Sequence, residues 1–155
     1  MPSRAWPCSV DSVPMPTELA DAAPIVTPIA SESDLIHVRQ LLRTEAVRAG
    51  LGLVDQTKLI TAGSELARNI LTYATSRAGE LNVEQIRSGE RVGVRATFAD
   101  RGPGIEDLEA AMTDGFSTNG SLGLGLPGSR RLVDTLTIRS EPGSGTIVVI
   151  VKWRR

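Results

Sequence analysis

The chain has a single cysteine, a single histidine and only 3% aromatic residues among its 155 residues. One cysteine, Cys8, excludes an internal disulfide and a cysteine-rich metal site. No apolar run approaches the roughly eighteen residues that a membrane-spanning helix needs. The 17 basic and 18 acidic residues nearly balance, and the arginines are spread along the chain, so nothing in the sequence indicates the clustered basic face that a nucleic-acid-binding protein needs. We therefore expect a cytoplasmic protein that binds neither membrane nor nucleic acid.

Length and proline content indicate one folded domain after a leader. Residues 1–24 hold five of the nine prolines and show no hydrophobic periodicity, which predicts a flexible leader that contributes little to the core. Residues 25–155 are enough for one domain with a proper core and too few for two. Trp6 falls in the leader, whereas Trp153 is expected at a sheet edge and Arg155 in solvent.

Hydrophobic periodicity predicts, in order, a strand, two helices, a hairpin, two shorter helices and a second hairpin. The strand over 25–29 contains Pro28, which confines it to an edge or an end of the sheet. Ser31 or Ser33 can cap the first helix, and Gly50 ends it. The other predicted elements are a helix from about Val54 to Ala74, strands over 81–87 and 91–99, helices over 105–112 and 124–132, and strands over 135–140 and 146–153. This order predicts a two-layer α/β sandwich, with helices on one face of a mostly antiparallel mixed sheet.

The most informative segment joins an acidic residue to a glycine turn at the end of an apolar strand. Asp100 follows the strand over 91–99, and Gly102 and Gly104 come next. Glycine has no Cβ, so the backbone can approach a flat ligand closely. A carboxylate fixed beside bare backbone suits an exocyclic amine such as that of adenine. An ordinary strand-to-loop turn is the alternative, because Asp, Gly and Pro dominate turns.

Glu65 and Asn69 are four residues apart on the second predicted helix, and therefore lie on one of its faces. They lie beside the apolar stripe of Leu66 and Ile70, at the border between core and solvent. The carbonyl oxygen of Asn is a suitable ligand for a magnesium ion, and Glu can accept a proton from an attacking hydroxyl or water. A solvated polar edge would have the same spacing.

A glycine-rich stretch that includes Gly120, Gly123 and Gly125 leads into the helix over 124–132. A helix N-terminus has free N–H donors and a partial positive charge, so it binds phosphate readily. Residues 123–128 also match the dinucleotide-binding fingerprint, but the segment before them is polar and does not predict the buried strand which that motif requires.

A second glycine turn precedes the last predicted strand. Thr146 begins this strand, and its hydroxyl can point at a ligand beside the strand that ends at Asp100. A hairpin turn followed by a β-branched strand residue is the simpler interpretation of Thr146 alone.

Together, these segments resemble the GHKL ATPase and kinase family in their order: Glu-Leu-x-x-Asn on a helix, Asp-x-Gly-x-Gly after a strand, a glycine-rich loop entering a helix, and Gly-x-Gly-Thr on a strand. The resemblance covers about residues 30–155. It is greatest to the small serine kinases of bacterial partner switching, over residues 64–70, 114–118, 125–128 and 150–153. It implies a Bergerat-type ATP-binding fold with ATP and Mg²⁺ as cofactors.

The resemblance also implies a role for each candidate residue. Asn69 would hold the magnesium ion that bridges the ATP phosphates, and Glu65 would orient and deprotonate the incoming hydroxyl. Asp100 would bind the adenine amine, with Gly102 leaving room for it and Thr146 supporting the same contact.

The same resemblance assigns the remaining glycines. Gly104 would also leave room for adenine, whereas Gly120, Gly123 and Gly125 would wrap the triphosphate. The segment between Gly104 and Gly120 would act as a lid that closes over ATP.

The implied function is a serine/threonine protein kinase that phosphorylates a STAS-domain antagonist or scaffold protein and activates a PP2C-type phosphatase by contact. An anti-sigma factor kinase that binds and inhibits a sigma factor would have the same site. A third interpretation is a non-catalytic module whose bound nucleotide only sets its shape for a partner.

Overall fold

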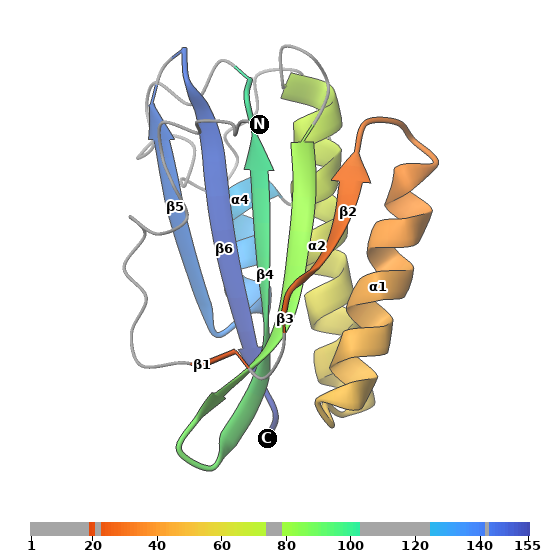
Figure 1. Ribbon diagram of the computed structural model, residues 1–155, viewed down its shortest axis with the longest axis vertical. Helices are drawn as coiled ribbons and strands as arrows, with labels where there is room; N and C mark the ends of the chain where they lie inside the picture. The colour runs from red at the N-terminus through yellow and green to blue at the C-terminus, as the bar shows by residue number, and fades with distance from the viewer. Residues whose placement is uncertain (1–18, 21–22, 74–78, 103–124, 142) are drawn as a thin grey trace.

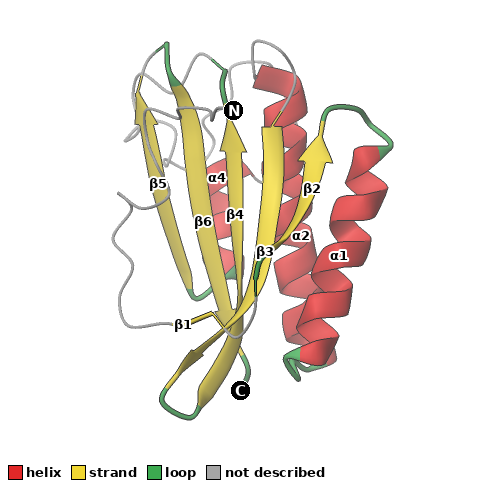
Figure 2. Cartoon of the chain, in the orientation of Figure 1, coloured by secondary structure: helices red, strands yellow, loops and turns green. Residues whose placement is uncertain are grey.

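The computed structural model describes residues 19–20, 23–73, 79–102, 125–141 and 143–155 (Figure 1). Its elements are β1 (Leu19–Ala20), β2 (Ile25–Ile29), α1 (Asp34–Arg48), α2 (Leu53–Tyr73), β3 (Gly79–Ser88), β4 (Arg91–Asp100), α4 (Gly125–Leu132), β5 (Thr135–Glu141) and β6 (Gly145–Trp153). The strands form one six-stranded sheet, and the helices lie against one of its faces (Figure 2). None of the helices in these ranges is long and apolar enough to cross a membrane. The predicted two-layer α/β sandwich is confirmed.

The sheet is antiparallel in every pairing between described strands. β3, β4, β6 and β5 lie side by side in that order, and β1 and β2 both pair with the free edge of β3. Pro28 in β2 lies opposite Glu80, on an edge strand as predicted. β1 was not predicted, since Leu19–Ala20 falls within the expected leader. It pairs with Arg87 and Ile86, whereas residues 1–18 and 21–22 lie outside the described residues.

Alternation along the central strands separates the two faces of the sheet. Val94, Ala96 and Phe98 of β4 belong to the core that the helices cover, as expected when successive side chains point to opposite faces. Helices α1 and α2 approach each other closely at Gly63, where a Cβ would collide with Leu42. The core therefore lies between the sheet and this helix pair.

The start of α1 differs from the predicted serine cap. Ser33 is the N-cap residue but makes no side-chain capping hydrogen bond. Instead, the Asp34 carboxylate accepts hydrogen bonds from the backbone amides of Ala30 and Ser31, at 2.8 and 3.0 Å. The bond from Ala30 is the largest of the effects that lower the pKa of Asp34. The helix ends as predicted, with Gly50 at a positive φ of 85°, a conformation common after helix C-termini.

The remaining predicted elements agree with the structure to within about two residues, apart from those that the structure does not describe. The hairpin of β3 and β4 and the hairpin of β5 and β6 both form, and α4 begins at residue 125. The predicted helix over 105–112 lies outside the described residues, as does the loop over 113–123.

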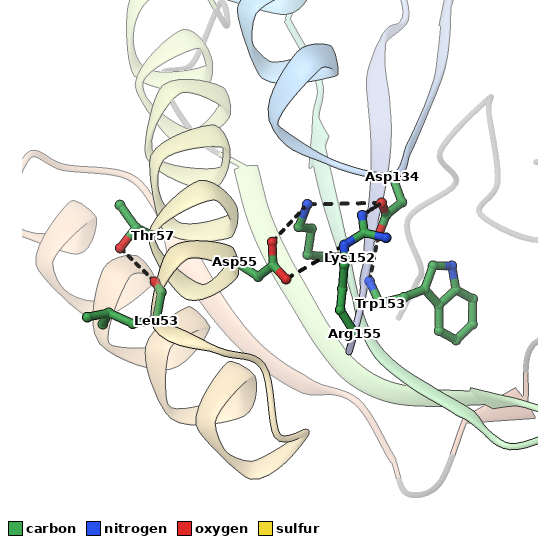
Figure 3. A network of polar contacts seen from close by, with 7 residues as sticks. All are labelled: Leu53, Asp55, Thr57, Asp134, Lys152, Trp153 and Arg155. Carbon is green, nitrogen blue, oxygen red and sulfur yellow. Dashed lines mark hydrogen bonds and ion pairs between the residues drawn. The ribbon is translucent and has the colours of Figure 1, made fainter.

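An ion-pair cluster ties the start of α2 to the end of β6 (Figure 3). The buried Lys152 ammonium lies 3.4 Å from Asp55 Oδ1 and 4.0 Å from Asp134 Oδ1. Arg155, expected in solvent, is mostly exposed yet pairs with both carboxylates. The Trp153 amide donates to Asp134 Oδ2 at 2.7 Å. This cluster closes the core at one end of the sheet.

Candidate functional site

Asp100, the last residue of β4, lies at the opposite end of the sheet from the ion-pair cluster. Its partners across the ladder are Thr146, the second residue of β6, and Gly79, the first residue of β3. The ends of three neighbouring strands therefore meet around it. By alternation, its side chain shares the face of Phe98, which the helices cover.

The Asp100 carboxylate is half-buried and held by backbone amides. The Gly102 amide donates a hydrogen bond to Asp100 Oδ1 at 2.7 Å. Burial raises the pKa of Asp100 above its ordinary value, and backbone hydrogen bonds from Gly102 and Thr146 oppose this shift. A desolvated carboxylate binds a hydrogen-bond donor more strongly than a solvated one does. The side chain is therefore suited to bind an amine.

Two glycines keep the backbone on either side of Asp100 bare. A Cβ at Gly145 would collide with the Asp100 carbonyl oxygen, and one at Gly79 would collide with the Ala99 carbonyl oxygen. Gly145 also has a φ of +110°, which L side chains rarely adopt. Sequence reasoning placed Gly145 only in a turn and missed Gly79. Their importance depends on strand register, which local patterns do not specify.

The Thr146 hydroxyl belongs to a small polar network at the same strand ends. Thr146 Oγ1 lies 2.8 Å from Ser140 Oγ, and Ser140 also donates to the Gly145 carbonyl at 3.1 Å. Ser140 was not predicted as a site residue. The signal was available in principle, because pairing the last two predicted strands across their turn places Ser140 opposite Thr146.

The second half of α2 lies next to Asp100. An ideal Cβ at Gly79 would be 3.0 Å from Ile70 Cγ2 and 3.2 Å from Asp100 Cβ, so both side chains flank the same glycine. Glu65 and Asn69 are half-buried on this helix, whereas Ile70 is buried. This confirms that the pair lies at the border between core and solvent.

Helix α4 directs its N-terminus toward the same end of the sheet (Figure 1). β5 follows α4 after two residues and starts at the far end, where Thr135 lies opposite Val151. Gly125, at the first position of α4, is half-buried with a φ of +66°. One turn later, Ser129 is fully buried, and its hydroxyl finds no hydrogen-bond partner among the residues that the structure describes. Helix α4 also packs against α2, and its direction turns its positive N-terminal end toward the end of the sheet where Asp100 lies.

The structure thus brings most of the described candidate residues to one end of the sheet. Asp100, Gly102 and Thr146 are in contact, Asn69 and Glu65 lie on the adjoining helix, and Gly125 starts the helix that points toward them. Gly104, Gly120 and Gly123, together with the predicted lid between 104 and 120, lie outside the described residues. A half-buried acceptor beside bare backbone, with a helix N-terminus facing it, suits a ligand that carries both an amine and phosphate groups.

Comparison with known proteins supports this interpretation. Residues 54–155 match the family described as histidine kinase-, DNA gyrase B-, and HSP90-like ATPase. The chain is 45% identical over 127 residues to the serine/threonine-protein kinase RsbT of Bacillus subtilis (strain 168), covering 82% of this chain and 94% of RsbT. It is 31% identical over 97 residues to an anti-sigma F factor of Thermoanaerobacter sp. (strain X514), covering 60% of this chain and 66% of that protein.

Solved structures show the same fold. The RsbU and RsbW domains of Rv1364c from Mycobacterium tuberculosis match with a TM-score of 0.59 and 23% identity, over 86% of this chain and 34% of that longer one. The mycobacterial sensor histidine kinase MprB matches with a TM-score of 0.53 and 19% identity, over 84% of this chain and 99% of that one. On the family match, on the identity to RsbT and on this shared fold, the chain belongs to the histidine kinase-, DNA gyrase B- and HSP90-like (GHKL) ATPase family.

Proposed function

We propose that this chain is a cytoplasmic, ATP-dependent serine/threonine protein kinase of a bacterial partner-switching pathway. The observation that carries the proposal is the 45% identity to RsbT, which extends over 94% of that kinase. The arrangement around Asp100 supports ATP as the phosphate donor, because its half-buried carboxylate can accept a hydrogen bond from the adenine amine. Gly102 and Thr146 hold that carboxylate in place.

Asn69 and Glu65 carry the chemistry in this proposal. Bound Mg²⁺ would neutralise charge on the ATP phosphates, and the amide oxygen of Asn69 would be its protein ligand. Glu65, one helical turn earlier, accepts the proton of the substrate hydroxyl as that oxygen bonds to the γ-phosphorus and ADP leaves. Phosphoryl transfer depends mostly on positioning and charge neutralisation, and a positioned base contributes roughly 10²- to 10⁴-fold in rate.

The proposed substrate is a serine or threonine of a STAS-domain antagonist or scaffold protein, as in the switch kinases that the chain resembles. A PP2C-type phosphatase, activated by contact, is the second proposed partner. The identity to an anti-sigma F factor favours one competing function, namely an anti-sigma kinase that binds and inhibits a sigma factor.

Transfer of labelled phosphate tests the proposal. The chain is incubated with γ-labelled ATP, Mg²⁺ and purified STAS-domain proteins from the same genome, and incorporation on serine or threonine is measured. Glu65→Gln should bind ATP normally and lose most of the transfer. Glu90→Gln is the control, because Glu90 is exposed in the turn between β3 and β4.

Each competing function predicts a different result. Transfer near the wild-type rate by Glu65→Gln would show that Glu65 is not the base. Capture of a sigma factor, with transfer to its antagonist, would favour the anti-sigma kinase. Phosphatase activation that survives in Glu65→Gln, without transfer by the wild type, would identify a non-catalytic activator.

A further inference from the structure

Three aliphatic side chains are exposed together at the turn over residues 49–52, which joins α1 to α2. Val47, Leu53 and Val54 flank this turn, with exposed fractions of 56%, 73% and 67%. The Gly50 amide donates to the Val47 carbonyl at 3.0 Å, so the turn is tight and the two helix ends adjoin. We call these three side chains the turn patch. Single exposed aliphatic residues are common, but a group of them with a polar rim indicates an interaction site.

The start of α2 does not require Leu53 and Val54. The first turn of a helix favours polar and acidic residues, which bind or attract its unpaired amides, and β-branched valine lowers helix propensity slightly. Both side chains are exposed and thus lie outside the core. Leu53 points away from the ion-pair cluster at this end of the sheet (Figure 3). Neither local folding nor core packing therefore explains these two residues, whereas contact with another molecule would.

Basic side chains surround the turn patch. Three of them lie within about one helical turn of it along α1 and α2, namely Arg43, Arg48 and Lys58. The fourth is Arg154, which follows β6 and lies against the turn, since a Cβ at Gly50 would be 2.9 Å from Arg154 Cδ. We call these four residues the basic rim. The whole chain has a formal net charge of -1, so the positive charge of the rim is a local feature.

The acidic residues nearest to the turn patch are directed into the fold. Glu45 is 3% exposed and accepts a hydrogen bond from Gln85 of β3 at 3.0 Å, besides pairing with Arg48. Asp55 pairs with the buried Lys152 in the ion-pair cluster. The exposed surface around the turn patch is therefore positively charged.

The aromatic ring at this end of the sheet is not part of the patch. Trp153, expected at a sheet edge, lies on the interior strand β6. The Arg91 guanidinium lies over its ring, 4.0 Å from the ring centre, which is a favourable cation–π arrangement. The apolar part of the exposed surface is therefore aliphatic and belongs to the helices.

We propose that the turn patch binds an acidic amphipathic helix of a partner protein. Apolar side chains on one face of that helix pack on the turn patch, as in other complexes that bind a helix through residues spaced by three or four. Aspartate and glutamate residues beside that face pair with the basic rim. Such complementary charges favour the correct partner and speed its association.

The same charges argue against two other occupants. A second copy of this chain fits poorly, because a symmetric interface would bring two basic rims together. An anionic membrane has the right charge, but a helix that lies in a membrane surface presents an apolar face along its length. The turn patch covers only one turn of each helix, which favours a protein segment.

The turn patch is remote from the proposed nucleotide site. It lies at the end of the sheet opposite to Asp100 (Figure 1). A helix rises about 1.5 Å per residue, so Leu53 and Asn69 are roughly 24 Å apart along the axis of α2. The partner helix and a nucleotide can therefore be bound at the same time, and the docking surface goes beyond the proposed kinase activity.

Titration of the isotope-labelled, full-length chain with a synthetic peptide tests the proposal by NMR. The probe is an end-capped peptide of leucine, alanine and glutamate, about 18 residues long so that a helix can form, with leucine on one face. It should shift the amide signals of the turn patch and leave those of Gly102 and Thr146 unchanged. Unchanged signals at the turn patch with millimolar peptide would overturn the proposal, as would shifts confined to other parts of the chain.

Two control peptides separate charge from apolar pattern. The first has lysine in place of glutamate, and the second has the same composition as the probe with leucine spread around the helix. Both should bind roughly tenfold more weakly than the probe or worse. Equal binding of the lysine peptide would refute the charge complementarity, and equal binding of the second peptide would refute the amphipathic contact.

Variants of the chain provide an independent measurement. Val47→Ser with Leu53→Ser should weaken binding of the probe roughly tenfold, because several apolar carbons are no longer buried in the complex. Arg43→Glu should also weaken it, with the apolar patch intact. Ile36→Ser is the control, since Ile36 is 55% exposed on the same helix, about three helical turns before Val47. Equal affinity of all these variants and the wild type would contradict the proposed contacts.

Sedimentation experiments test the other occupants. Phosphatidylglycerol vesicles should not bind the chain; vesicle binding that Val47→Ser with Leu53→Ser abolishes would assign the patch to a membrane. A dimer that dissociates in the same double variant would assign it to a second copy. Either result would overturn the proposal.

Calorimetry tests whether the two sites are separate. The dissociation constant of ATP with Mg²⁺ should be the same with and without saturating probe peptide, and competition between the two would refute simultaneous binding. The NMR titration itself needs no nucleotide. A chain that bound the peptide but no ATP would therefore keep the docking surface and lose the proposed kinase activity.

Discussion

Replacing Asp100 by asparagine tests the proposed adenine contact with little change in shape. The oxygen of the asparagine amide can still accept the 2.7 Å hydrogen bond from the Gly102 amide, so the side chain should keep its orientation. The other carboxylate oxygen becomes an NH₂ group, which donates where the adenine amine also donates. A hydrogen bond to a charged group contributes about 1.5–3 kcal/mol, so the dissociation constant of ATP should rise roughly 10- to 150-fold.

Isothermal titration calorimetry with ATP and Mg²⁺ measures this change, after circular dichroism has shown that the variant is folded. Asp34→Asn is the control, because Asp34 also accepts hydrogen bonds from backbone amides but lies at the start of α1. Wild-type affinity in Asp100→Asn would remove Asp100 from the nucleotide site. An equal loss in Asp34→Asn would show that the effect is not local to the site.

Three further predictions concern stability. Burial raises the pKa of Asp100 above 3.8, so the stability that it contributes is full below pH 3.8 and lost as the pH rises through its folded-state value. Without nucleotide, Asp100→Asn should therefore have a higher melting temperature than the wild type at neutral pH, and the difference between the two should shrink as the pH falls. A difference that does not change with pH would contradict this. Gly145→Ala should lose more free energy of unfolding than Gly143→Ala, because both residues have positive φ but only a Cβ at Gly145 would collide with the backbone at the end of β4. The strained backbone conformation alone costs on the order of 1–3 kcal/mol. Equal losses for the two variants in urea unfolding would refute the close approach. Lys152→Met should lower the free energy of unfolding by about 2–3 kcal/mol, less than the ~3–5 kcal/mol typical of a broken buried ion pair. The loss is smaller because Arg155 still pairs with both carboxylates. An unchanged midpoint of urea unfolding would show that the ion-pair cluster adds no stability.

Much of the fold was predictable because its signals are local. The apolar stripe that includes Leu59 and Ile70 predicted α2, and alternation with glycine turns predicted both hairpins to within about two residues. Pro28 placed β2 on an edge correctly, because proline cannot donate to a ladder on both sides. β1 could not be predicted, because two residues carry no periodicity and only their pairing with β3 defines a strand.

The candidate site was predictable in its residue types and their order. Asp100 at a strand end and the Glu65–Asn69 pair on a helix were candidates by residue type and spacing, and only the order of all the segments, through the family resemblance, gave them proposed roles. Gly79 and Ser140 were missed, because each matters only through the residue opposite it on another strand. The ion pairs of Lys152 and Arg155, at the other end of the sheet, were not predicted for a similar reason, since their carboxylate partners come from α2 and from the segment before β5.

By itself, the sequence determined which segments become helices or strands and which residue types stand at their ends, because periodicity, caps and glycine turns act over a few residues. Only the tertiary structure decided which of these ends meet. Antiparallel register set Asp100 between Thr146 and Gly79, and helix packing brought Ile70 beside them. The burial that raises the pKa of Asp100 and the hydrogen bond from the Thr146 amide follow from that meeting, since both depend on residues far apart along the chain. The hydrogen bond from the Gly102 amide is local and forms within the turn itself.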